Sequence, residues 1–70
     1  MKVKQDKHNY LPRQNEIVDY EKQMNSTLDQ CQQRLKRWFI NTPNITIGRG
    51  GSHIFVSDRK TKERILLITV

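Results

Sequence analysis

Apolar residues between positions 15 and 40 recur at the spacing of an α-helix. Two series with steps of seven residues, offset by four, place the apolar side chains in one narrow stripe. Asn15 is a residue type that caps helix N-termini, no Gly or Pro interrupts the segment, and Glu21 is the one polar residue at a stripe position. The pattern predicts a single helix over residues 15–40. The apolar residues of the stripe are Ile17, Met24, Leu28, Cys31, Leu35 and Trp38.

This stripe needs a surface to pack against. A helix of about 26 residues is about 39 Å long at 1.5 Å per residue, which is more than a sheet of two or three short strands covers. We therefore expect a homodimer, joined by paired helices or by strand edges. In the alternative arrangement only residues 28–39 pack on the chain's own sheet, and the N-terminal half of the helix projects.

The spacing changes to a period of two in the C-terminal part of the chain, which is typical of β-strands. Residues 45–47 and 53–57 alternate, and residues 65–70 are apolar on both sides. Residues 48–51, with three glycines, are expected to form a turn, and residues 58–63 a charged loop. A strand that is apolar on both sides indicates cover on both faces or burial in an oligomer interface. Its last residues are expected at an edge of the sheet, unless another segment pairs with them.

The first 14 residues are mostly polar and show no period. We expect them to form a flexible basic arm, followed by a single domain over residues 15–70. The predicted fold class is α+β: one long N-terminal helix followed by a three-stranded antiparallel β-meander, in a dimer.

Composition limits the classes of function. The chain of 70 residues has 13 Lys and Arg against seven Asp and Glu, a net charge of +6, and a pI near 9.9. Such a charge favours a polyanionic partner, above all RNA or DNA. One cysteine allows no intramolecular disulfide, and no apolar run of 18 residues or signal-peptide pattern is present. We expect a cytoplasmic protein without a membrane association, a metal site or a cofactor.

Basic side chains are expected to neutralise phosphates along a nucleic-acid backbone. Phe55 or Trp38 could offer a ring on which a base stacks. The alternative is that this basic surface only keeps the protein in solution. The expected nucleic-acid-binding residues are Arg34, Lys36, Arg37, Arg49, Arg59, Lys60, Lys62 and Arg64.

His53 is the one candidate for catalysis. An imidazole that titrates near neutral pH can act as general acid or base when a 2′-hydroxyl attacks the neighbouring phosphodiester. The alternative is that this lone histidine, at the start of a strand, has only a structural role. No carboxylate pair, Ser/His/Asp set or metal-ligand spacing accompanies it.

Three segments together resemble a known family. The helix ending in Leu35-Lys36-Arg37-Trp38-Phe39, the Gly51-Ser52-His53 that opens a strand, and the strand of residues 64–69 are similar to the core of HicA-type toxins. These are small mRNA interferases of the double-stranded-RNA-binding-domain type. The resemblance covers residues 32–69 and implies that His53 is the catalytic residue of a ribonuclease. The long helix and the arm depart from that family.

The sequence thus predicts a small cytoplasmic nucleic-acid-binding protein. The resemblance favours RNA over DNA and suggests a toxin-like role. The alternative is a small regulator or inhibitor, for example a viral one, that binds a partner protein through the apolar stripe of its helix or through a free strand edge. Whether the protein is an enzyme stays open, and a ribonuclease that uses His53 is the third hypothesis.

Overall fold

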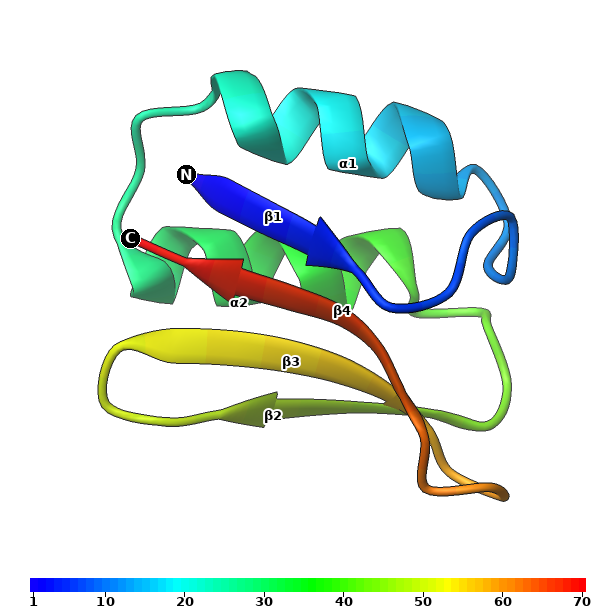
Figure 1. Ribbon diagram of the computed structural model, residues 1–70. Coiled ribbons are helices and arrows are strands. Elements are labelled where there is room, and N and C mark those ends of the chain that lie inside the picture. Colours follow the sequence, from blue (N-terminus) through cyan, green and yellow to red (C-terminus); the bar gives the residue numbers. More distant parts are fainter.

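The computed structural model describes residues 1–70 and shows a four-stranded antiparallel sheet with two helices on one face (Figure 1). The strand order in the sheet is β1-β4-β3-β2. The class is α+β, but the expected single helix with three strands is wrong. In chain order, the elements are β1 (Lys2–Gln5), α1 (Gln14–Gln23), α2 (Leu28–Trp38), β2 (Ile45–Arg49), β3 (His53–Asp58) and β4 (Arg64–Thr69).

The predicted long helix is interrupted between Met24 and Thr27. Met24 is extended, with ψ at 133°, and its N–H is the last to bond back into α1. Thr27 then caps α2: its hydroxyl accepts from the Gln30 N–H at 3.2 Å, and the Gln30 side chain accepts from the Thr27 N–H at 3.1 Å. Ser, Thr and Asn offer the backbone such local hydrogen bonds, and for this reason they start helices more readily than they continue them.

Four of the six residues of the apolar stripe lie in the chain's own core, whereas Met24 and Trp38 are only partly buried. Ile17 of α1 and Leu28, Cys31 and Leu35 of α2 are buried in one cluster with the inward side chains of β3 and β4. Two helices of 10 and 11 residues each fit over the sheet, whereas one helix of residues 15–40 would not. The length argument for a dimer therefore no longer applies, and the homodimer itself stays a prediction. Neither helix is long and apolar enough to cross a membrane.

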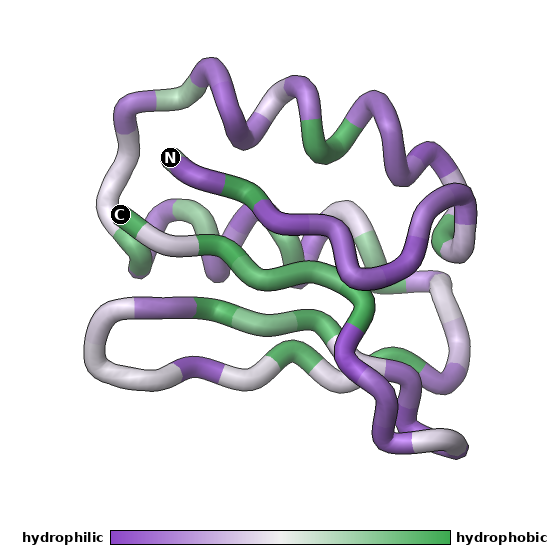
Figure 2. Tube along the Cα trace, in the orientation of Figure 1, coloured by the Kyte–Doolittle hydropathy of each residue, from purple (hydrophilic) through white to green (hydrophobic).

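The fourth strand comes from the segment that was expected to be a flexible arm. Val3 lies opposite Ile68, and β1 pairs with β4 along its whole length. β4 is therefore an inner strand rather than an edge. Ile65, Leu66 and Ile68 are buried in the core, whereas Leu67 is only partly covered on the opposite face. Figure 2 shows the longest apolar stretches along β3 and β4, with the largely polar β1 beside them.

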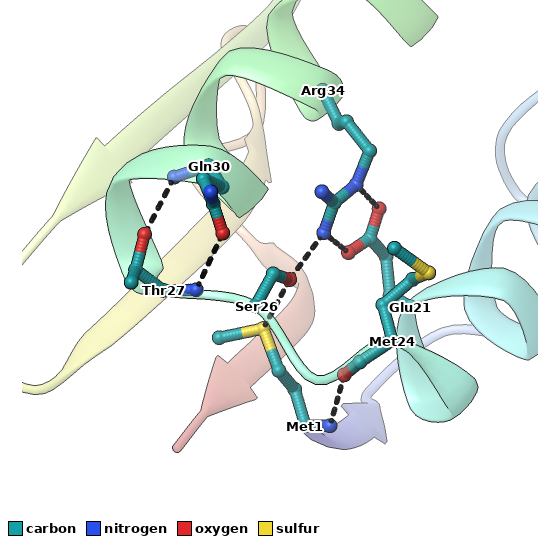
Figure 3. A network of polar contacts seen from close by, with 7 residues as sticks. All are labelled: Met1, Glu21, Met24, Ser26, Thr27, Gln30 and Arg34. Atoms are coloured by element: carbon teal, nitrogen blue, oxygen red, sulfur yellow. Dashed lines mark hydrogen bonds and ion pairs between the residues drawn. The ribbon is translucent and has the colours of Figure 1, made fainter.

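A buried ion pair joins the two helices (Figure 3). Glu21 is 0% exposed and accepts two hydrogen bonds from Arg34, at 2.8 and 3.0 Å. The same guanidinium donates to the Ser26 hydroxyl at 2.5 Å. Burial, with the negative charge of Glu21 beside it, raises the pKa of the Cys31 thiol to about 12. The polar residue in the apolar stripe is thus the partner of a specific arginine and fixes α1 against α2.

Candidate nucleic-acid interface

The face of the sheet opposite the helices is uncovered. Along β3, Ile54 and Val56 are buried beneath the helices, so His53 and Phe55, which alternate with them, point to the other face. Pairing across the sheet places side chains of β1, β2 and β4 beside these two rings. We call this surface the open sheet face. Its residues are Lys2, Lys4, Thr46, Gly48, His53, Phe55, Ser57, Leu67 and Thr69.

Two glycines make room for the two rings. A Cβ atom on Gly48 would lie 2.0 Å from Cζ of Phe55, and one on Gly50 would lie 2.2 Å from Cε1 of His53. The Phe55 ring therefore leans from β3 across β2, and the His53 ring leans over Gly50, the residue after β2. The two ring centroids are 6.1 Å apart and the ring planes 29° apart. We call this ring pair the aromatic platform.

A turn was expected over residues 48–51; Gly50 and Gly51 do lie between β2 and β3, but Gly48 and Arg49 belong to β2. No glycine in the chain has a positive φ, and β2 continues through Gly48 to Arg49. The turn itself is closed by the Gly50 N–H, which donates to the His53 carbonyl at 2.9 Å. At positions 48 and 50 the missing side chain matters more than the freedom of the backbone, because any Cβ would meet a ring.

Internal ion pairs reduce the basic surface. Five of the 13 Lys and Arg residues pair with five of the seven carboxylates, so eight cations have no carboxylate partner. The net charge of +6 is carried by these eight cations against Asp19 and Asp58. The eight are Lys2, Lys4, Lys22, Lys36, Arg37, Arg59, Lys60 and Lys62.

Three of the eight expected nucleic-acid-binding residues are engaged within the protein. Arg34 holds the buried Glu21, and this carboxylate raises the pKa of the Arg34 guanidinium. Arg49 points to the helix side and pairs with Asp29 of α2. Arg64 pairs with Asp6 at 2.5 Å, and this hydrogen bond lowers the pKa of Asp6. These arginines are less available to phosphates than the sequence suggested.

The other five expected residues form two groups on different parts of the molecule. Arg59, Lys60 and Lys62 lie in the β3–β4 loop, and Arg59 and Lys62 line a hollow of about 240 Å³ together with Phe55. Lys36 and Arg37 lie at the end of α2, on the helix side. The loop group therefore adjoins the aromatic platform, and the α2 group does not.

The β3–β4 loop is held in place by the segment that follows β1. The Tyr10 hydroxyl donates to Asp58, and Lys7 pairs with Glu63 at 2.7 Å. Asp58 also accepts from the backbone N–H groups of Lys60 and Thr61. These hydrogen bonds, led by that of Tyr10, lower the pKa of Asp58. These contacts thus hold the loop, and with it the three cations, in a fixed position.

His53 has neighbours that suit stacking better than proton transfer. Its ring lies against Gly50 and Phe55, and its side chain makes no hydrogen bond or ion pair. No carboxylate orients the imidazole, as a general base usually requires. The protein also has no cluster of three or more His, Cys, Asp and Glu side chains that could hold a metal ion.

Sequence reasoning missed the connection between the lysines of β1 and the rings of β3. Across the sheet, Lys2 lies in the same row as His53, and Lys4 lies in the same row as Phe55. One β4 residue separates the two members of each pair. The alternation of Lys2, Val3 and Lys4 was the available signal, but a strand of four residues with one apolar side chain gives little pattern to detect. In comparisons with known proteins, no family model, no curated protein and no solved structure matched this chain.

Proposed function

We propose that this protein binds single-stranded nucleic acid on its open sheet face, in the cytoplasm. Bases would stack on the aromatic platform, while Lys2 and Lys4 on one side and the β3–β4 loop on the other neutralise phosphates. The observation that carries the proposal is the pair of rings leaning over Gly48 and Gly50 on an uncovered sheet. Surface aromatics with flanking cations are the usual means of binding single strands without a fixed sequence.

The distribution of charge supports this site. Five of the eight cations without a carboxylate partner lie on the open sheet face or in the adjoining loop. Phosphate contacts of this kind make affinity fall steeply with salt, by a slope of about 0.7 per contact for single strands. RNA is favoured over DNA only through the resemblance to RNA-cleaving toxins, and the experiment below includes both.

Fluorescence anisotropy with a labelled U-rich RNA of 12 nucleotides, and with its DNA counterpart, tests the proposal. Phe55→Leu keeps an apolar side chain but removes the ring, and we expect it to weaken binding about 10-fold. Lys4→Gln should weaken binding and lower the salt slope by about 0.7. Lys22→Gln removes the same charge from α1, on the other side of the sheet, and serves as the matched control.

The proposal predicts that the Lys22→Gln variant binds like the wild type at every salt concentration. Equal losses for Lys4→Gln and Lys22→Gln would show that only net charge matters. Wild-type affinity in Phe55→Leu would remove the aromatic platform from the site. Absent binding to both polymers would reject nucleic-acid binding altogether.

The other two hypotheses have less support in the fold. The apolar stripe offered to a protein partner is largely covered by the chain's own sheet, although the outer edges of β1 and β2 remain as strand edges. A ribonuclease would depend on His53, whose side chain has no polar partner. Cleavage of RNA by the wild type that is lost in His53→Ala would establish the enzyme, and no cleavage by either would dismiss it.

A further inference from the structure

The largest hollow on the protein lies on the helix side, away from the open sheet face. It has a volume of about 430 Å³ and is lined by Arg13, Tyr20, Arg34, Arg37 and Trp38. We call it the helix groove. It arises because α1 and α2 run antiparallel, which brings the start of α1 beside the end of α2. Neither the sequence patterns nor the proposed function accounts for it.

Arginines and aromatic rings are in contact in this groove. The Arg13 guanidinium carbon lies 4.7 Å from the centre of the Trp38 ring, and that of Arg34 lies 5.7 Å from the centre of the Tyr20 ring. The two rings meet edge to face, with centroids 6.0 Å apart. Tyr20 is nevertheless 43% exposed, so the groove opens to solvent.

Arg13 contradicts the local preferences of its position. It is the N-cap of α1, yet its side chain makes no capping hydrogen bond. Its φ of 57° is in the left-handed region, which non-glycine residues other than Asn and Asp rarely occupy. A cation also stands at the positive end of the helix dipole, where an anion is preferred. Local conflicts of this kind concentrate at functional sites.

The groove has cations to offer to an anion. Arg34 is committed to the buried Glu21, but Arg37 has no carboxylate partner. Arg13 pairs with Glu16, and both side chains are 58% exposed, so this ion pair is easily exchanged. When Arg13 moves, the face of Trp38 that it covers becomes free. The groove can thus present two guanidiniums and an indole face together.

We propose that the helix groove binds a nucleoside 5′-monophosphate group, either as a free nucleotide or as the phosphorylated 5′ end of a strand. The base would replace Arg13 on the Trp38 ring, and Arg37 with the released Arg13 would hold the phosphate. One guanidinium fork satisfies a carboxylate, as Glu16 and Glu21 show, whereas a terminal phosphate with three free oxygens suits two. This site goes beyond the proposed function and does not depend on the open sheet face.

Trp38 is the only tryptophan, so its fluorescence reports on the groove directly. We would titrate the protein at low salt with adenosine 5′-monophosphate, adenosine, inorganic phosphate and N-acetylphenylalanine, an aromatic carboxylate that represents a peptide C-terminus. Saturable quenching by the nucleotide should occur at concentrations about 10-fold lower than for adenosine or phosphate alone, because each lacks one half of the contacts.

Arg37→Gln should weaken nucleotide binding about 10-fold, and Lys36→Gln is the matched control with the same charge loss on a residue outside the groove. Phe55→Leu should leave the quenching unchanged. Competition by a 5′-phosphorylated oligonucleotide but not by its 5′-hydroxyl form would identify strand ends as the source of the ligand. Competition by neither would identify the free nucleotide.

Three results would overturn the proposal: no saturable quenching by the nucleotide, equal losses in Arg37→Gln and Lys36→Gln, or tighter binding of N-acetylphenylalanine, which would make the groove a peptide site. If RNA binding still depends on Phe55 in any of these cases, the proposed function stands while this inference fails. If the nucleotide quenches Trp38 but the protein does not bind RNA, the helix groove stands while the proposed function fails.

Discussion

At the scale of single residues, Gly48 and Gly50 decide where the rings of β3 can lie. Neither has a positive φ, so conformational freedom does not explain them. What they provide is space, because Phe55 and His53 occupy the positions that their side chains would take. Glycines beneath aromatic rings also support sheets through packing alone, and for this reason binding and stability must be measured separately.

We expect Gly48→Ala to separate these two roles. The added Cβ would meet the far end of the Phe55 side chain, which can swing away, so the free energy of unfolding should change by less than about 1 kcal/mol. The displaced ring should still weaken RNA binding several-fold. Thermal denaturation followed by circular dichroism, with anisotropy on the same sample, measures both. A large loss of stability would show that the ring position mainly supports the sheet.

For Arg13 we expect a substitution that raises stability and weakens binding. Asn tolerates the left-handed conformation and caps helices, so Arg13→Asn should raise the Tm by about 4 °C despite the lost ion pair and ring contact. The same change should weaken nucleotide binding in the helix groove. A lower Tm, measured by calorimetry beside the wild type, would mean that Arg13 is held in place for stability and not for binding.

At the scale of elements, the strands were easier to predict than the helices. The three strands expected in the second half are present at 45–49, 53–58 and 64–69, where β-branched and aromatic residues are frequent. The helix break was missed because α1 and α2 pack on the same core, and their apolar spacing continues across it. Thr27 and Gln30 form a capping box that was visible in the sequence and gave the signal for a new helix.

The site was predictable only in part, because residue type alone does not show which side chains meet in the fold. His53, Phe55 and the basic loop could be named from residue type, but the partners of Arg34, Arg49 and Arg64 depend on how distant segments meet. An arginine looks the same in a sequence whether it faces solvent or a carboxylate on another helix. The helix groove requires the antiparallel pairing of α1 and α2, which a single continuous helix does not allow.

The contact between α1 and α2 has a measurable pH dependence. The unfolded thiol of Cys31 loses its proton near pH 9.0, whereas the folded one keeps it up to about 12. Between these values the unfolded state binds fewer protons, so the stabilising effect, complete below pH 9, is lost as the pH rises. We expect the free energy of unfolding to fall by about 1.4 kcal/mol per pH unit in this window.

Urea denaturation at pH 8 and pH 10 tests this expectation, with Cys31→Ala as the reference. Other groups that titrate in this range are common to both proteins, so the difference between their pH slopes belongs to Cys31. Ellman's reagent should label the native thiol only as fast as the protein opens, because Cys31 is 0% exposed. Rapid labelling at pH 8, or equal pH slopes, would show that this helix contact is looser than described.

At the scale of the whole molecule, two layers give two different surfaces. The sheet side carries rings and unpaired cations, and the helix side carries the groove and most of the internal ion pairs. With most of the apolar stripe inside the core, a homodimer joined by strand edges would use the outer edge of β1 or of β2. A size measurement with and without RNA tests the predicted homodimer, and a pairing of edges would leave both surfaces free.

The central claim is that nucleic acid lies on the open sheet face, and an NMR titration tests it most directly. Increasing amounts of the unlabelled 12-nucleotide RNA would be added to ¹⁵N-labelled protein. The account predicts amide shifts concentrated in β1, in residues 53–57 of β3 and in the β3–β4 loop, with smaller shifts in α1. Shifts confined to α1 and α2, or spread evenly over all exposed lysines, would contradict it.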